Sequence, residues 1–267
     1  MINFNSNSSS TTSLLQQVQE KQTSLMEKLA SGKRINSAAD GAAAQQIIDR
    51  LTSQVEGNRQ AINNAYDGIS LAQVAESGLS GINDDVNRIR ELTLQAGSGV
   101  LNDADRQAIQ SEITQLQDNI SQTIDQTTFG GKPLLSAEGE INFQVGANPD
   151  QSVGVRTSDV AGNLSGILNI DITSGDLDAA LQAADEAVES VGGVRADLGA
   201  TQNALASTAR NLSEADVNVS AARSRIQDLD YAQAVSENIS NSVLGQAATS
   251  VQAQANQQQG QVLALLN

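Results

Sequence analysis

One segment decides the fold. Residues 177–226 read LDAALQAADEAVESVGGVRADLGATQNALASTARNLSEADVNVSAARSRI and contain no proline. Every seventh residue is apolar, namely Leu177, Ala184, Val191, Leu198, Leu205, Leu212, Val219 and Ile226. The repeat predicts one continuous helix about 75 Å long, at about 1.5 Å per residue, with an apolar stripe along one side. Because a single helix cannot cover such a stripe, the pattern also predicts partner helices along most of its length.

The companion position of the same repeat is only partly apolar. It holds Leu181, Val188, Arg195, Gln202, Ala209, Asp216 and Arg223. The seam between this helix and its partners is therefore apolar throughout at one heptad position and half polar at the other.

The N-terminal half of the chain supplies two partner helices. Residues 47–89 carry apolar side chains in steps of three and four, with a change of phase near Glu76. A glycine-containing break at 97–102 follows, and Asn102 or Asp103 is expected to cap the next helix. That helix has the stripe Ile109, Ile113, Leu116, Ile120 and Ile124. The three stripes predict a mainly α fold, a long helical bundle with coiled-coil-like packing.

The central segment has a different texture. Both prolines, Pro133 and Pro149, lie in it, and short runs of alternating apolar and polar residues are separated by Gly, Asn and Asp. The runs are 141–146, 153–156 and 169–172. This pattern is typical of strands and turns, so we expect a small β-hairpin element at about 129–176 that caps one end of the bundle.

Both ends of the chain are expected to be helices that a lone chain cannot bury. Residues 238–267 contain no charged side chain, and Gln, Ala, Ser and Asn dominate there. Paired with each other and with copies of themselves, the N- and C-terminal helices would form an uncharged, tightly packed core. The side chains expected to pack in it are Leu14, Val18, Leu25, Leu29, Val235, Ile239, Val243, Val251, Val262, Leu263, Leu265 and Leu266.

Composition excludes several classes of function. The 267 residues include no His and no Cys, so the common transition-metal sites and the triads and dyads built on those residues are excluded. A net charge of −16, with 31 acids against 15 Lys and Arg, argues against nucleic acid as a partner. The sequence shows neither a secretory signal nor a stretch of about 20 apolar residues. We expect no enzyme, no cofactor and no membrane insertion.

Two acidic patterns are candidates for catalytic or metal sites. Asp84 and Asp85, or Asp103 and Asp105, suit general acid–base chemistry in type, but they are better explained as solvated helix faces or first-turn charges. Residues 169–175 resemble part of a calcium loop, yet the glycine comes one place late and the bidentate Glu is missing. Neither pattern predicts a catalytic or metal site.

A third pattern concerns recognition. Arg88, Ile89, Arg90, Glu91 and Leu92 form a cluster that we expect on an exposed side of the first long helix. Ion pairs on the helix surface would explain it, and so would a partner-binding face, since Arg forms bidentate contacts and its stem packs.

Taken together, the chain resembles bacterial flagellin. The stretches that follow the pattern of that family, in order, are 29–38, 66–71, 88–92, 128–135, 143–148, 226–232 and 254–266. They include Leu-Ala-Ser-Gly-Lys-Arg-Ile-Asn-Ser-Ala, Arg-Ile-Arg-Glu-Leu and Thr-Phe-Gly-Gly-Lys-Pro-Leu-Leu. The resemblance covers nearly the whole chain. It departs from the family at Gly41, which follows Asp40 directly, and at Gln259, where the family commonly has proline.

The resemblance implies a fold and a function. Residues 1–42 and 229–267 would form the inner layer of a helical filament, residues 43–228 the surrounding bundle, and no further outer domain would be present. The chain would be a self-polymerising structural subunit of the bacterial flagellar filament, used for motility and located outside the cell. It would leave the cell through the flagellar type III system without a cleaved signal peptide.

The resemblance also implies partners. They are other copies of the chain, a flagellar export chaperone, the filament cap, the hook–filament junction proteins and the flagellin-sensing Toll-like receptor of the host. For receptor binding and the inter-subunit face, the family pattern falls on Arg88, Ile89, Arg90, Glu91, Leu92 and Glu112. Two alternatives stay open, a hook–filament junction protein and a soluble secreted coiled-coil adhesin or receptor ligand.

Overall fold

The computed structural model describes the backbone of residues 4–174 and 176–266, and the side chains of these residues apart from 4–11, 259, 260 and 262–266. The long helices are α1 (Phe4–Ser31), α2 (Ala38–Ala96), α3 (Asp103–Gln126), α6 (Leu177–Gln227) and α7 (Tyr231–Leu266). Between α3 and α6 lie β1 (Thr128–Phe129), β2 (Lys132–Pro133), β3 (Ser136–Gln144), β4 (Ser152–Asp159), α4 (Val160–Asn163) and α5 (Ser165–Leu168). The prediction of a mainly α fold with a small β element is confirmed.

The chain forms two compact units. Residues 1–53 and 218–267 make the first, here called the terminal unit, and residues 54–217 make the second, here called the bundle unit. Helices α2 and α6 contribute to both. The predicted division at residues 42 and 228 concerns layers of an assembly and stays a prediction.

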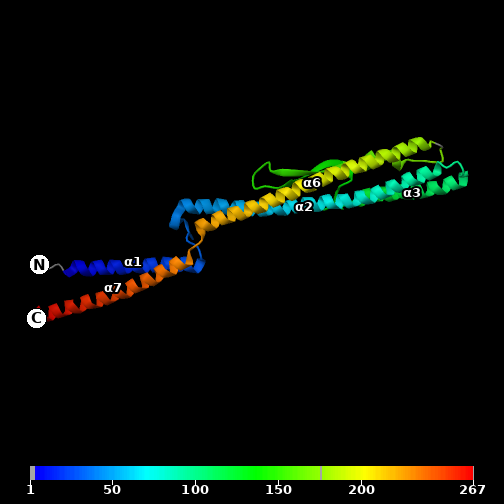
Figure 1. Ribbon diagram of the computed structural model, residues 1–267. Helices are drawn as coiled ribbons and strands as arrows, with labels where there is room; N and C mark the ends of the chain where they lie inside the picture. Colours follow the sequence, from blue (N-terminus) through cyan, green and yellow to red (C-terminus); the bar gives the residue numbers. More distant parts are fainter. Residues whose placement is uncertain (1–3, 175, 267) are drawn as a thin grey trace. The chain divides into compact units, whose positions relative to one another are not determined.

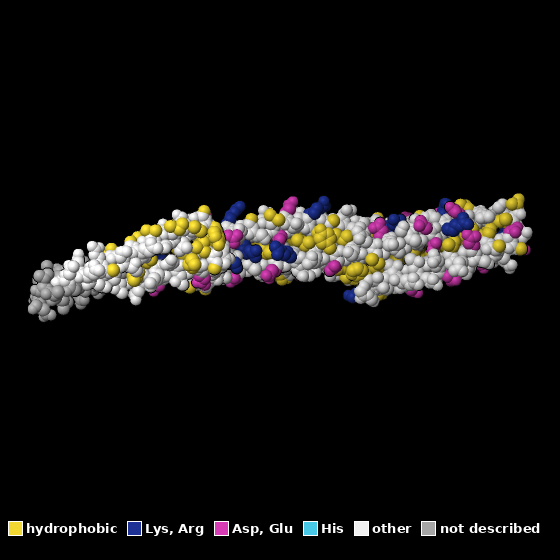
Figure 2. Space-filling model, turned by 90° about the horizontal axis from the view of Figure 1, so that it is seen from below, with side chains coloured by type: hydrophobic (Ala, Val, Ile, Leu, Met, Phe, Trp, Pro, Cys, Tyr) yellow, Lys and Arg dark blue, Asp and Glu magenta, His cyan; other side chains and the backbone are white. Residues whose placement is uncertain are grey.

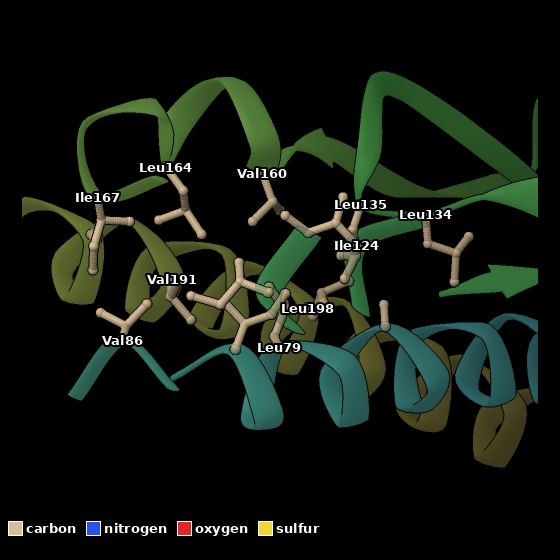
Figure 3. Close-up of a cluster of buried hydrophobic side chains, with 14 of the residues drawn as sticks. Leu79, Val86, Ile124, Leu134, Leu135, Val160, Leu164, Ile167, Val191 and Leu198 are labelled. Atoms are coloured by element: carbon tan, nitrogen blue, oxygen red, sulfur yellow. The ribbon is translucent and has the colours of Figure 1, made fainter. Parts of the chain in front are cut away.

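In the bundle unit, α2, α3 and α6 pack side by side around one apolar core (Figure 1). Their stripes interlock: Leu79 and Val86 of α2, Ile124 of α3, and Val191 and Leu198 of α6 point toward one another (Figure 3). Each of these five side chains is at most 4% exposed. Complete burial of such a side chain contributes roughly 1.5–3 kcal/mol, which explains why the long helices need one another.

The predicted helix starts and lengths are largely correct. Helix α6 runs unbroken through the whole predicted segment 177–226. The α2–α3 turn ends at Asn102, whose side chain accepts from the Asp105 backbone N–H at 3.0 Å, while the Asp105 carboxylate accepts from the Asn102 N–H at 3.1 Å. This reciprocal capping box satisfies two backbone donors that would otherwise lack partners, and it fixes where α3 begins. No break in α2 accompanies the phase change near Glu76.

Strands β3 and β4 form an antiparallel hairpin whose central pairs run from Glu140–Arg156 to Gln144–Ser152. The expectation that it caps one end of the bundle is wrong, because the hairpin lies along the flank (Figure 1). Its contacts follow α2: a Cβ added at Gly57 would meet Ala147 at 2.9 Å, and one added at Gly68 would meet Phe143 at 3.1 Å. These glycines let the hairpin approach the helix closely.

A second correction concerns residues 169–172, which were expected to be a strand. They form a turn after α5. Gln110 of α3 holds this turn by donating to the Ile170 carbonyl at 3.1 Å and accepting from the Ile172 N–H at 2.9 Å. Because a side chain from α3 satisfies the backbone, Ile170 and Ile172 are buried without pairing in a sheet.

In the terminal unit, α1 and α7 lie side by side (Figure 1). The segments that lead into and out of them are joined by backbone hydrogen bonds, from Arg34 N–H to the Gln227 carbonyl at 2.6 Å and from Leu229 N–H to the Gly32 carbonyl at 3.1 Å. Gly32 has φ of 69°, a left-handed conformation that glycine adopts without strain and that ends α1.

Candidate recognition and assembly surfaces

The predicted recognition cluster is built on Arg88 of α2. Its guanidinium donates from Nε and Nη2 to Glu112 Oε1 of α3 at 3.1 and 2.8 Å, and from Nη1 to Glu91 Oε2 at 3.1 Å. The bonds to Glu112, followed by those to Glu91, raise the pKa of Arg88 above its ordinary value. All three side chains are about half exposed or more, so the ion pairs link α2 to α3 at the surface and add little stability.

Arg90 makes the corresponding contact with the other neighbour. Its Nε lies 2.6 Å from Asp185 Oδ1 of α6. Arg88 and Arg90 therefore tie α2 to α3 on one side and to α6 on the other, and both side chains remain partly exposed to solvent. The arrangement offers a partner a fixed charge pattern of two cations flanked by Glu91, Glu112 and Asp185.

The expectation that the whole 88–92 cluster is exposed is wrong for two members. Ile89 is 0% exposed and Leu92 is 2% exposed. They lie on the core side of α2, because three to four residues complete a helical turn and both continue the stripe of Ile82 and Val86. The site residues that a partner can reach in this conformation are thus Arg88, Arg90, Glu91 and Glu112.

The terminal helices leave much of their apolar surface uncovered. Of the predicted core residues, Val18 is buried at 6% exposure, while Leu25 and Leu29 are half-buried. Five are exposed: Leu14, Val235, Ile239, Val243 and Val251, at 39–59%. Apolar side chains gather over α1 and α7 in Figure 2. The side chains of Val262, Leu263, Leu265 and Leu266 lie outside the described residues.

The exposed apolar side chains of α7 form a stripe. Val235, Ile239 and Val243 follow one another in steps of four, so they share one face of the helix. Met26 of α1 and Leu244 of α7 are also more than half exposed, and the sequence reasoning did not single them out. Two helices alone bury one stripe each, and the second apolar side of α7 is free to pack against another protein surface.

Polar contacts fix the ends of these helices. Asp40 accepts from the backbone N–H groups of Asn36 and Ser37 at 3.1 and 3.0 Å and pairs with Lys28 at 3.3 Å. These hydrogen bonds, with the Lys28 charge, lower the pKa of Asp40. Tyr231 at the start of α7 donates to the Leu29 carbonyl at 2.8 Å. The α1–α7 pair is therefore clamped at the end where the chain enters the long helices.

Sequence reasoning missed how the half-polar seam is used. Gln202 of α6 donates to Glu76 of α2 at 2.9 Å, and Arg195 lies 3.9 Å from the same carboxylate. Further along, Arg59 of α2 lies 3.4 Å from Asp216 of α6. The polar residues at this heptad position thus pair with polar partners on α2. These pairs could have been found in the sequence by aligning the first long helix antiparallel to residues 177–226 and looking for a polar residue opposite each polar seam position.

The described residues contain no group of three or more acidic side chains placed to hold a metal ion. In the segment that resembles a calcium loop, the Asp171 carboxylate accepts from the backbone N–H and hydroxyl of Thr173 at 2.8 and 2.5 Å, and these bonds lower the pKa of Asp171. None of the helices in the described range is long and apolar enough to span a bilayer.

Comparison with family models gives two matches. Residues 2–140 match the bacterial flagellin N-terminal helical region, and residues 181–266 match the bacterial flagellin C-terminal helical region. Between them the two matches leave out residues 141–180, which hold the end of β3, β4, α4, α5 and the start of α6, together with one residue at each end of the sequence.

Comparison with characterised proteins agrees. The chain is 39% identical to a flagellin of Bacillus subtilis, with 90% of this chain and 91% of that protein covered. It is 38% identical to the flagellar filament 33 kDa core protein of Treponema phagedenis, with the same coverage.

Solved structures share the fold. A crystal structure of Bacillus cereus flagellin matches with a TM-score of 0.51 at 23% identity, covering 56% of this chain and 88% of that one. A putative flagellar hook-associated protein from Vibrio parahaemolyticus matches with a TM-score of 0.60 at 16% identity, covering 71% of this chain and all of that one. At these identities the likeness concerns the fold alone.

Proposed function

The chain belongs to the bacterial flagellin family, and on that premise we propose that it polymerises with copies of itself into the helical tube of a flagellar filament that serves motility. It is a structural protein and not an enzyme. The observation that carries the proposal is the uncovered apolar stripe of α7, formed by Val235, Ile239 and Val243 in a segment poor in charge.

The energetics favour assembly through this stripe. Full burial of a Val or Ile side chain contributes roughly 1.5–3 kcal/mol, and these side chains still expose 39–59% of their surface in the single chain. Residues 238–267 have no charged side chain whose desolvation would oppose burial. Several such contacts per chain, repeated over many copies, supply a driving force for polymerisation.

Within that filament, residues 1–42 and 229–267 form the inner layer and residues 43–228 the surrounding bundle. The support is chemical: the apolar, charge-poor surface belongs to the terminal helices, whereas the bundle unit buries its apolar core within itself. The hairpin and the short segment from α4 to α6 take the place where a longer chain would insert outer domains.

The same proposal includes recognition by the flagellin-sensing Toll-like receptor. Arg88, Arg90, Glu91 and Glu112 form the receptor-contacting and inter-subunit face, while Ile89 and Leu92 anchor the helix beneath it. If this is correct, Arg88→Ala weakens receptor activation by monomer while the circular dichroism of the chain is unchanged. Unaltered activation would place the recognition site elsewhere.

Further partners follow from the life cycle of such a subunit. We include the flagellar type III apparatus for export without a cleaved signal peptide, an export chaperone that covers the C-terminal segment, the cap at the filament tip and the hook–filament junction proteins. The exposed apolar side chains of α7 support the need for a chaperone, because a chain with that surface self-associates at high concentration.

The test is seeded growth observed by electron microscopy. Purified full-length chain is added to short seed fragments of filament, and micrometre-long tubes are expected. A matched chain that lacks residues 238–267 is the control, and it is expected to stay monomeric. Long filaments from the truncated chain would contradict the role of α7.

The same experiment separates the alternatives. A hook–filament junction protein shares the terminal helices but adds only a few copies to a seed. A soluble adhesin or receptor ligand stays monomeric under all salt conditions. Open-ended growth by the full chain excludes both.

A further inference from the structure

Among the large apolar side chains that the structure describes, Val100 is the most exposed, at 89%. It lies in the turn between α2 and α3, and Leu94 in the last turns of α2 is 52% exposed. Val100 lies just before the capped start of α3 and, at this exposure, adds nothing to the apolar core of the bundle unit. Its exposure calls for a partner surface.

Two carboxylates adjoin this turn in sequence, and the register of α6 against α2 brings two more to the same end of the bundle unit. Asp103 and Asp105 lie in the first turn of α3, and Asp176 and Asp178 lie at the start of α6. The Arg90–Asp185 contact fixes the register of α2 against α6, and seven residues further along the two antiparallel helices Asp178 comes beside Gly97. We call Val100 and these four residues the acidic tip. Within the described residues none of the four carboxylates forms an ion pair with Lys or Arg.

A complementary surface exists in the terminal unit. Five cations, here called the basic collar, lie on segments that adjoin one another: Lys33, Arg34, Arg50, Arg223 and Arg225. Arg34 donates to the Ile226 carbonyl at 2.7 Å, next to Arg225, and Arg223 donates to Thr52 Oγ1 at 3.5 Å, two residues after Arg50. Both of these acceptors are neutral, and none of the five cations forms an ion pair in the described part of the chain. Ile47, one helical turn before Arg50, is 45% exposed.

The acids beside the collar already accept hydrogen bonds. Asp228, whose backbone bridges to that of Lys33, accepts from the Ser224 hydroxyl, and Asp49 accepts from the Gln45 amide. Asp40 is bound to Lys28 and to the backbone before α2, and Asp230 accepts from the N–H groups of Ala232 and Gln233 at the start of α7. The collar therefore presents cations that lack carboxylate partners, beside one exposed apolar side chain. The acidic tip presents the reverse, four carboxylates that form no ion pair in the described part of the chain, with Arg106 as the single cation beside them in sequence, next to an exposed valine.

We propose that the acidic tip of one chain docks on the basic collar of a second copy, with Val100 against Ile47. This inference rests on the proposed self-assembly and deepens it by naming one inter-subunit contact. Because two different surfaces of the same chain meet, the contact is heterologous and repeats from copy to copy without closing, as open filament growth requires. The paired charges also offset part of the repulsion between strongly acidic copies and fix their register.

Cross-linking in filaments tests the contact directly, since the natural chain has no cysteine. The variant Val100→Cys/Ile47→Cys is polymerised on seeds and then oxidised. A disulfide forms only when the two Cα atoms come within about 7 Å, so a ladder of covalent trimers and longer species on a denaturing gel is expected. The control is Val100→Cys/Val74→Cys, because Val74 is also exposed on α2 but lies outside the collar. It is expected to give background cross-linking only.

Normal filaments with no more cross-linking than the control would overturn the contact and leave the proposed function standing. A product that stops at dimers would overturn it too, because it indicates a closed, two-fold contact. If the natural chain fails to grow on seeds at all, the proposed function itself fails.

Charge reversal gives a second, independent readout. Arg50→Glu/Arg225→Glu is expected to slow elongation several-fold at low salt, and adding Asp103→Lys/Asp178→Lys to the same chain is expected to restore most of the rate. Both pairs lie on exposed positions, and circular dichroism checks the fold of each variant. A quadruple variant that elongates no faster than the collar variant would contradict the pairing of these two surfaces.

Discussion

The terminal unit and the bundle unit differ in charge as sharply as in packing. Residues 1–53 and 218–267 contain seven Lys and Arg and seven Asp and Glu, so the terminal unit has no net charge. Residues 54–217 contain eight cations and 24 acids, so the whole net charge of −16 belongs to the bundle unit. The unit with the exposed apolar stripe is thus the one that copies can approach without net repulsion.

Packing follows the same division. The bundle unit buries most of its leucines and isoleucines internally, with Leu79, Ile82 and Ile89 at 0% exposure, and Leu94 near its end is an exception. In the terminal unit Val235, Ile239 and Val243 remain exposed. A unit that completes its own core is stable as a monomer, while a unit that does not must find the rest of its core in other copies. That contrast can be tested in four ways.

The largest effect comes from making the same truncation in both units. Ile120→Ala in α3 removes a side chain that is 0% exposed, and we expect the free energy of unfolding to fall by about 2–5 kcal/mol. Ile239→Ala in α7 removes one that is 59% exposed, and we expect a change within about 0.5 kcal/mol in the monomer. Denaturant unfolding of the monomer measures both.

In filament assembly, we expect the Ile239 variant to show the larger effect of the two. If Ile239 becomes buried between copies, its loss raises the critical concentration for filament growth by roughly tenfold or more, since about 1.4 kcal/mol corresponds to a factor of ten. Sedimentation of filaments at a series of protein concentrations gives this value. Equal monomer destabilisation by the two variants would abolish the distinction between the units.

A second pair of variants asks whether the hairpin flank of the bundle unit is tightly packed. A Cβ at Gly78 would lie 2.5 Å from Thr127 Oγ1 and 3.2 Å from Leu135, so Gly78→Ala is expected to destabilise the chain by about 1–3 kcal/mol. Gly192 in α6 has nothing within 4 Å of its added Cβ, and Gly192→Ala is expected to stabilise by about 0.5–1 kcal/mol through helix propensity. Thermal unfolding of both variants checks the two signs.

The bundle unit was the easier of the two to predict from the sequence. The heptad repeat from Leu177 to Ile226 and the apolar stripe of α3 both have the period of a helix, and the structure has both helices. The 169–172 turn was missed because its apolar–polar alternation is the same as that of a strand. What separates them is the Gln110 side chain, 60 residues away, which satisfies the backbone.

The recognition cluster shows a different limit of prediction from the sequence. The resemblance to flagellins placed Arg88 and Glu112 in one site, and the structure has the two side chains 2.8 Å apart. Sequence reasoning also counted Ile89 and Leu92 as exposed, although both continue the buried stripe. The error came from treating five consecutive residues as one surface, which a helix with 3.6 residues per turn cannot provide.

The difference in net charge between the two units can be tested by varying the salt concentration. Because the net charge of −16 lies entirely in the bundle unit, neighbouring copies repel there, and screening lengths fall from about 30 Å at 0.01 M salt to about 8 Å at 0.15 M. We expect elongation on seeds to speed up several-fold over this range. Light scattering follows the rate. Growth that is no faster at the higher salt would show that the acidic surfaces of neighbouring copies do not face one another.

The smallest expected effect is a pH dependence in the terminal unit. The pKa of Asp40 lies below its ordinary value of 3.8, because the folded chain donates hydrogen bonds to its carboxylate from Asn36 and Ser37 and places Lys28 beside it. A depressed pKa means that the carboxylate stabilises the fold above the ordinary value and that this contribution is lost as pH falls through the lower value of the folded state.

Asp40→Ala should therefore lower the melting temperature slightly at pH 7, and the difference from the natural chain should vanish in acid. Glu237→Ala is the matched control, since Glu237 is an acid of the same unit on the exposed surface of α7. A difference that persists unchanged in acid would mean that Asp40 acts through its shape at the helix start and not through its charge.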